Sequence, residues 1–107
     1  MLDDAYCRTM AAYNRWMNER LYDLCGSLPD ADRRRDLGAF FGSIHATLDH
    51  GLWADRVWLS RFTGEPRPAG ALGEVQYPGF DALRAARGQV DAEIERWAAG
   101  VTDAWLR

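Results

Sequence analysis

Hydrophobic residues recur every three or four positions along three stretches of the chain, which is the spacing of an amphipathic helix. In the first stretch, about residues 3–24, the stripe is Tyr6, Met10, Tyr13, Met17, Leu21 and Leu24. In the second, about residues 33–62, it is Leu37, Phe41, Ile44, Leu48, Leu52, Leu59 and Phe62. In the third, about residues 80–99, it is Phe80, Leu83, Val90, Ile94, Trp97 and Val101. The pattern predicts one all-α domain, residues 1–107, in which the three stripes form a shared core.

The connections follow from glycine and proline. Gly26 and Pro29 end the first predicted helix, and Asp30 or Asp32 caps the second, whose three arginines we expect in a solvated first turn. Residues 64–79 contain three prolines and four glycines, which excludes a helix over most of that span. The span is long for a bundle loop, so it is expected to cross from one end of the bundle to the other.

One carboxylate interrupts the second stripe. Asp55 stands at the helical spacing of Leu52 and Leu59, on the inner face of its helix. A buried carboxylate costs several kcal/mol unless it is paired, so the sequence predicts a partner for Asp55. The narrow solvent-facing arc of the same helix is expected to include Asp49 and Arg56.

Composition excludes several classes of function. The chain has 107 residues and a net charge of −3, and its positive charge is all arginine. It has no basic stripe for nucleic acid and no apolar run of membrane-spanning length, so neither a nucleic acid nor a membrane is an expected partner. Cys7 and Cys25 lie about 27 Å apart along one predicted helix, which precludes an intrachain disulfide there. A reducing, cytoplasmic setting is the expectation.

The two histidines, His45 and His50, are five residues apart, or about 140° around a helix. They therefore cannot close on one metal ion as an i, i+4 pair does. The small side chains Ala46 and Ala54 leave room beside His50 for an ion, a water or a ligand. A packed imidazole with an ordinary hydrogen bond is the simpler interpretation of either residue from spacing alone.

Two runs of sequence carry a family resemblance: YNRWMNERLYDLCGSLPD at 13–30 and FFGSIHATLDHGLWADRVWLSRFTGE at 40–65. The most specific part is the TLxHxxxADRxWL pattern at 47–59. The chain resembles the DinB-like (damage-inducible) proteins over essentially its whole length. The resemblance implies a four-helix bundle in which His50 is the first of three ligands to a divalent metal, nickel or zinc. The other two ligands would come from an HxxxH pair on the last helix.

The chain departs from that pattern in one respect. It ends at Arg107, shortly after the third predicted helix, and contains no HxxxH. We therefore expect the family's fourth helix to be missing and the metal site to be incomplete, with His50 as its one ligand here. Three helices built for a four-helix core leave an apolar face bare, so we expect a homo-oligomer, a dimer.

Two classes of function follow. The resemblance implies a metal-dependent, thiol-using transferase or a hydrolase in the complete form, acting on a small molecule, with His50 as ligand and Asp55 as an orienting carboxylate. The alternative is a non-catalytic helical module for self-association or protein interaction. The sequence contains no nucleophile elbow, phosphate-binding glycine loop or CxxC motif, and it assigns no catalytic residue.

Overall fold

The computed structural model describes residues 3–38, 42–66, 68, 70 and 74–101. These residues form four helices: α1 (Asp4–Gly26), α2 (Asp30–Arg34), α3 (Ile44–Thr63) and α4 (Phe80–Gly100). Three are long and α2 has five residues. The all-α prediction is confirmed for the described part of the chain. Nowhere in that part is a helix both long enough and apolar enough to cross a membrane.

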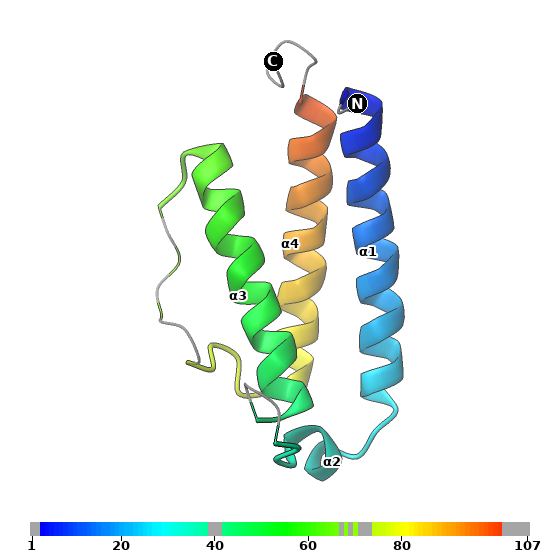
Figure 1. Cartoon of the computed structure of the whole chain (residues 1–107), viewed down its shortest axis with the longest axis vertical. Coiled ribbons are helices and arrows are strands. Elements are labelled where there is room, and N and C mark those ends of the chain that lie inside the picture. The colour runs from blue at the N-terminus through cyan, green and yellow to red at the C-terminus, as the bar shows by residue number, and fades with distance from the viewer. Residues whose placement is uncertain (1–2, 39–41, 67, 69, 71–73, 102–107) are drawn as a thin grey trace.

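The three long helices lie side by side, with α4 between α1 and α3 (Figure 1). α3 and α4 run in the same direction and α1 runs opposite to both (Figure 1). α3 ends at one end of the bundle and α4 starts at the other, so the chain has to cross the length of the bundle between them (Figure 1). The predicted crossover is confirmed.

The first and third predicted helices correspond to α1 and α4, and their predicted limits match to within two residues. Asp3 caps α1 by accepting a hydrogen bond from Tyr6 N at 2.7 Å, which satisfies one of the free N–H groups of the first turn. Asp4 follows in that turn, where a negative charge complements the helix dipole. Gly79 precedes α4, which begins at Phe80 as predicted.

The predicted continuous helix over 33–62 is wrong before Ile44, because the described residues 35–38, 42 and 43 are not helical. α2 ends at Arg34, and α3 begins only at Ile44, where the Ser43 side chain accepts from Ala46 N at 3.0 Å. Between them, Gly38 and Gly42 take positive φ angles of 74° and 88°, a conformation that favours glycine. The local pattern of apolar residues suggested one continuous helix, but the left-handed backbone of these two glycines is incompatible with one. Phe41 of the predicted stripe lies outside the described residues.

The expectation that all three arginines of this segment are solvated is also wrong for Arg33. Its side chain is buried, and its guanidinium carbon lies 4.2 Å from the centre of the Phe80 ring. Arg33 Nη1 also donates to Cys25 O at 3.2 Å, which ties α2 to the end of α1. The contact of the guanidinium with the Phe80 ring and its hydrogen bond to the Cys25 carbonyl together stabilise the buried charge of Arg33.

The core is built around α4. Its predicted stripe is buried except for Trp97, which is partly buried and packs against the core. Leu52 of α3 and Leu83 of α4 have no exposed surface. Loss of either side chain to alanine is expected to cost about 2–5 kcal/mol in a core of this kind.

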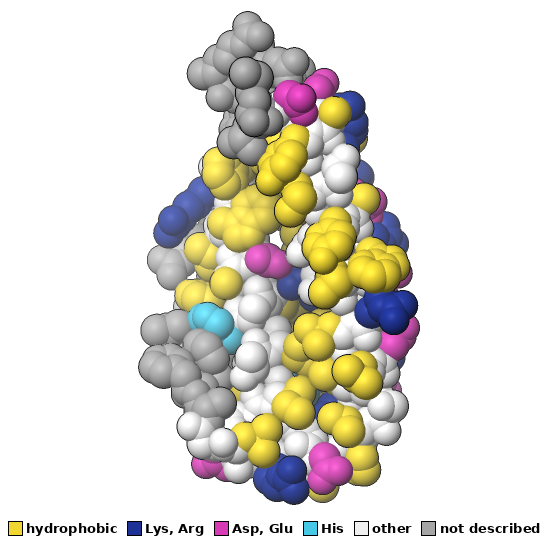
Figure 2. Space-filling model, turned by 45° about the vertical axis from the view of Figure 1, so that its right-hand side comes forward, with side chains coloured by type: hydrophobic (Ala, Val, Ile, Leu, Met, Phe, Trp, Pro, Cys, Tyr) yellow, Lys and Arg dark blue, Asp and Glu magenta, His cyan; other side chains and the backbone are white. Residues whose placement is uncertain are grey.

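The predicted core stripe of α1 faces outward, and this is the largest correction. Its residues are 43–68% exposed, as is Trp16: Tyr6, Met10, Tyr13, Trp16, Met17, Leu21 and Leu24. The side of α1 that contacts α4 carries Ala11, Tyr22 and Cys25, together with two asparagines. Figure 2 shows the resulting concentration of hydrophobic side chains over the α1 side of the molecule.

Asp49, predicted to face solvent, is instead 1% exposed and holds the end of the crossover connection. Its carboxylate accepts from Gln76 N at 2.9 Å and from Tyr77 N at 2.7 Å. One turn earlier, His45 Nε2 lies 2.7 Å from Tyr77 O. A carbonyl oxygen only accepts, so His45 donates from Nε2. Together the two side chains position the connection where α4 starts.

We predict that Asp49→Ala destabilises the fold by about 2–4 kcal/mol, because two backbone N–H groups lose a charged acceptor. Urea unfolding followed by circular dichroism measures the change. Glu93→Ala, at an exposed position in α4, is the matched control and should change stability by less than about 0.5 kcal/mol. Equal effects for the two variants would show that the carboxylate of Asp49 does not hold the connection.

Candidate functional site

A groove of about 360 Å³ runs between the three long helices. α1 contributes Tyr6, Cys7 and Met10, and Trp58 and Trp97 line the opposite side from α3 and α4. Two polar side chains, Asn14 and Asp55, also line it. The groove therefore combines an aromatic wall with an amide and a carboxylate, and it borders the exposed stripe of α1.

Asp55 has the partner that its position in the stripe requires. Its Oδ2 accepts from Arg87 Nη2 at 2.7 Å, and its Oδ1 accepts from Trp58 Nε1 at 3.0 Å. The predicted pairing of Asp55 is confirmed. Sequence reasoning missed the partner itself, although Arg87 stands within the α4 stripe, four residues after Leu83 and three before Val90. That spacing was the available signal, since an arginine inside an apolar stripe also needs a partner.

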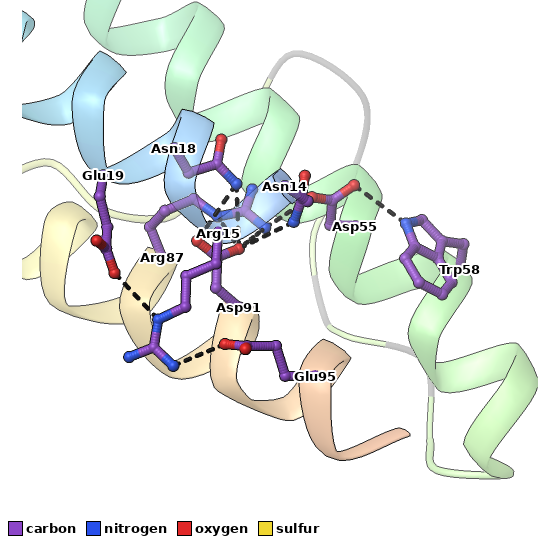
Figure 3. Close-up of polar contacts among 9 residues, drawn as sticks. All are labelled: Asn14, Arg15, Asn18, Glu19, Asp55, Trp58, Arg87, Asp91 and Glu95. Atoms are coloured by element: carbon purple, nitrogen blue, oxygen red, sulfur yellow. Dashed lines mark hydrogen bonds and ion pairs between the residues drawn. The ribbon is translucent and has the colours of Figure 1, made fainter. Parts of the chain in front are cut away.

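Arg87 is the centre of a polar cluster that joins all three long helices, in which Arg87 and Asp91 are buried and the other members are partly buried (Figure 3). Its side chain is 7% exposed, and its Nε donates to Asp91 Oδ1 at 3.0 Å. From α1, Asn18 Nδ2 donates to the same oxygen at 3.1 Å, and Asn14 Nδ2 approaches it at 3.4 Å. The cluster thus takes one carboxylate from α3, an ion pair from α4 and two amides from α1.

The charge balance of this cluster shapes the titration of Asp91. Burial raises the pKa of Asp91 above its ordinary value, while Arg87 and Asn18 oppose that rise by favouring the carboxylate. The negative charge of Asp55 adds a smaller upward contribution to the pKa. One guanidinium therefore serves two carboxylates in a partly dehydrated space. The hydrogen bonds of the cluster join its own side chains to one another and thereby fix the relative positions of the three helices.

A second polar group lies farther from this centre. Arg15 donates to Glu19 at 3.0 Å within α1 and to Glu95 of α4 at 2.7 Å (Figure 3). All three side chains are at least one-third exposed, so each ion pair contributes little to stability. The Arg15–Glu95 ion pair aligns α1 with the second half of α4.

The histidines occupy different environments and do not meet at one site. His45 is 2% exposed and bonded to the crossover connection. His50 is half-buried on α3, with its ring centre 5.9 Å from that of Trp53. Within the described ranges, no three His, Cys, Asp or Glu residues form a group that could hold a metal ion. The described residues therefore do not fit the three-ligand site that the resemblance implies.

We predict that Arg87→Met destabilises the fold by about 3–5 kcal/mol at pH 7, because it leaves Asp91 charged and buried without its cation. Arg84→Met, in the same helix, is the matched control. Arg84 pairs with Asp23, but it is 45% exposed, so its loss should cost less than about 1 kcal/mol. Urea unfolding of both variants measures the difference, and equal losses would contradict the central role of Arg87.

The same variant should respond to pH. The raised pKa of Asp91 means that the native state binds this proton more readily than the unfolded chain does. The contribution of Asp91 to stability therefore falls as pH rises from the unfolded pKa through the native one. Removing Arg87 raises the native pKa further, so the loss in Arg87→Met should be smaller at pH 5 than at pH 8. A loss independent of pH would mean that Asp91 stays charged in the variant.

Comparison with known proteins adds one positive finding. The model of the DinB family matches residues 1–107, which agrees with the resemblance carried by the pattern around His50. Neither the curated proteins nor the solved structures give a match. The match over the full sequence is sufficient to assign the family: this chain belongs to the DinB family.

Proposed function

We propose that this DinB-family chain is a self-associating helical module in which a second copy covers the outer face of α1. The observation that supports the proposal is the exposure of seven large apolar side chains along that helix, between 43% and 68% each. A contiguous apolar surface of this kind is uncommon on a protein that stays monomeric and is typical of an interface.

The groove extends this surface toward α3. Tyr6 and Met10 belong both to the exposed stripe and to the groove wall, so the two form one surface. Farther along α1, a hollow of about 620 Å³ is lined by Met17, Leu21 and Leu24 among others. A helix lying along α1 would fill the groove and the hollow and would bury the stripe, as a neighbouring helix does in a bundle.

We predict that the wild-type chain sediments as a dimer at micromolar concentration and that Met17→Asp shifts it to a monomer. A carboxylate in the middle of the stripe would have to be buried without a partner on association. Ala12→Asp, at an exposed position on another side of α1, is the matched control and should leave the dimer intact. Sedimentation velocity distinguishes the species, and a wild-type monomer would overturn the proposal.

A second candidate function is divalent-metal binding through His50, with transferase or hydrolase chemistry on a small molecule in a completed site. Two observations favour it: the family membership, and the half-buried imidazole of His50 on α3. Because the described residues hold no complete ligand group, the remaining ligands would have to come from outside them. The free thiols Cys7 and Cys25 are consistent with a reducing, cytoplasmic setting.

Elemental mass spectrometry of untagged protein tests the metal proposal. If this second candidate holds, the wild type contains near-stoichiometric nickel or zinc, and His50→Ala loses it while the circular dichroism spectrum stays unchanged. Metal retained by the variant would remove His50 from the ligand set. No metal in either protein would contradict the metal proposal and leave self-association as the function.

A further inference from the structure

We propose that two copies pair through α1 in an antiparallel arrangement, with Asp3 of each copy opposite Arg20 of the other. This inference rests on the self-association proposed above and adds its geometry. It commits the outer face of α1 to a second copy of the chain. The basis is the order of apolar and charged residues along the exposed stripe.

The alternating steps of three and four residues that let two helices pack along a seam are present in part of this stripe, and Asp3 and Arg20 extend them on either side. We call the resulting seven positions the seam; Asp3 stands in it as the half-buried N-cap residue just before α1. The positions of the seam, in order, are Asp3, Tyr6, Met10, Tyr13, Met17, Arg20 and Leu24. The line thus has an acidic residue near one end, a basic residue near the other and four apolar residues between them. Arg20 is exposed, and its guanidinium carbon lies 5.0 Å from the centre of the Trp16 ring.

This order is complementary to itself when the second helix is reversed. Antiparallel pairing around the middle of the stripe places Asp3 opposite Arg20, Tyr6 opposite Met17, and Met10 opposite Tyr13. A two-fold axis repeats every contact, so each dimer gains two ion pairs, one at each end of the seam. The overlap, residues 3–20, is about 27 Å long at the helical rise.

Other alignments leave Arg20 badly placed. Parallel pairing sets Arg20 against Arg20 of the second copy. An antiparallel shift by one seven-residue repeat sets it against Met10, where its charge would lose water without meeting an acid. The apolar residues of the seam would permit either alternative, because flexible side chains such as methionine adapt to different partners. Charge therefore selects the register.

Asp3 is able to take part because its capping role occupies one oxygen. Oδ1 accepts from Tyr6 N at 2.7 Å. A carboxylate accepts through both oxygens, so Oδ2 can receive a guanidinium N–H from Arg20 of the second copy. The contact would lie at the edge of an apolar seam, where an ion pair is less screened than on an open surface.

A charge exchange between two variants tests this geometry. Asp3→Arg and Arg20→Asp should each weaken the homodimer at least about tenfold, because each sets like charges together at both ends of the seam. Mixed in equal amounts, the two variants should form a heterodimer with near-wild-type affinity, since every end then joins opposite charges. Sedimentation equilibrium with one variant fluorescently labelled measures all three affinities.

Two controls separate charge from other effects. Asp3→Ser keeps a capping oxygen but removes the charge, so it should weaken the dimer less than Asp3→Arg does. Arg8→Asp changes an exposed charge off the stripe and should leave the affinity unchanged.

The outcomes distinguish this inference from the proposal on which it rests. A wild-type monomer overturns self-association and this geometry together. A wild-type dimer that Met17→Asp disrupts, but that the charge variants leave unchanged or whose mixture gives no rescue, overturns the antiparallel register alone. Weakened homodimers together with rescue in the mixture support the proposed register. A parallel pair would also join opposite charges in the mixture, but its two homodimers would oppose like charges just as the wild type does and would therefore be no weaker than the wild type.

Discussion

The packing of the three long helices depends on the buried guanidinium of Arg87. It bonds Asp55 on α3 and Asp91 on its own helix, and Asp91 in turn receives the amides of Asn14 and Asn18 from α1. A buried charge that loses its partner is strongly destabilising, so these contacts restrict how the helices can rotate. Asn18 must face inward. Met17, one residue earlier, then points about 100° away, which turns the apolar stripe of α1 outward.

This constraint explains why the sequence predicted the limits of α1 and not its orientation. Caps and breakers such as Asp3 and Gly79 act locally, so helix ends near them could be predicted. The orientation of a helix depends on which face its neighbours satisfy. By hydrophobicity alone, the stripe through Met10 and Met17 should face the core. The polar face of α1 turns inward instead, because Asp91 accepts hydrogen bonds from the side-chain amides of Asn14 and Asn18. Asp91 lies 73 residues beyond Asn18 in the sequence, so this demand is not visible near α1.

For the candidate site too, the sequence predicted a local requirement but not the residue that meets it. The placement of Asp55 among apolar residues showed that it needs a partner, and it has one. That the partner is Arg87 depends on α4 lying beside α3, which spacing within either helix does not specify. Asp49 was not predicted to be buried. Nothing near it in the sequence indicates burial, because its hydrogen-bond donors are the backbone N–H groups of Gln76 and Tyr77. Only the return of the connection brings them together.

The two proposed functions place separate demands on the molecule. Self-association uses α1, and its geometry requires nothing from the histidines. A three-histidine metal site requires more imidazoles than pairing supplies, because each chain has two histidines and one of them, His45, is buried against the connection. Two copies then offer His50 twice, one short of three. Association through α1 therefore does not by itself complete such a site, and metal content and oligomeric state should respond to different substitutions.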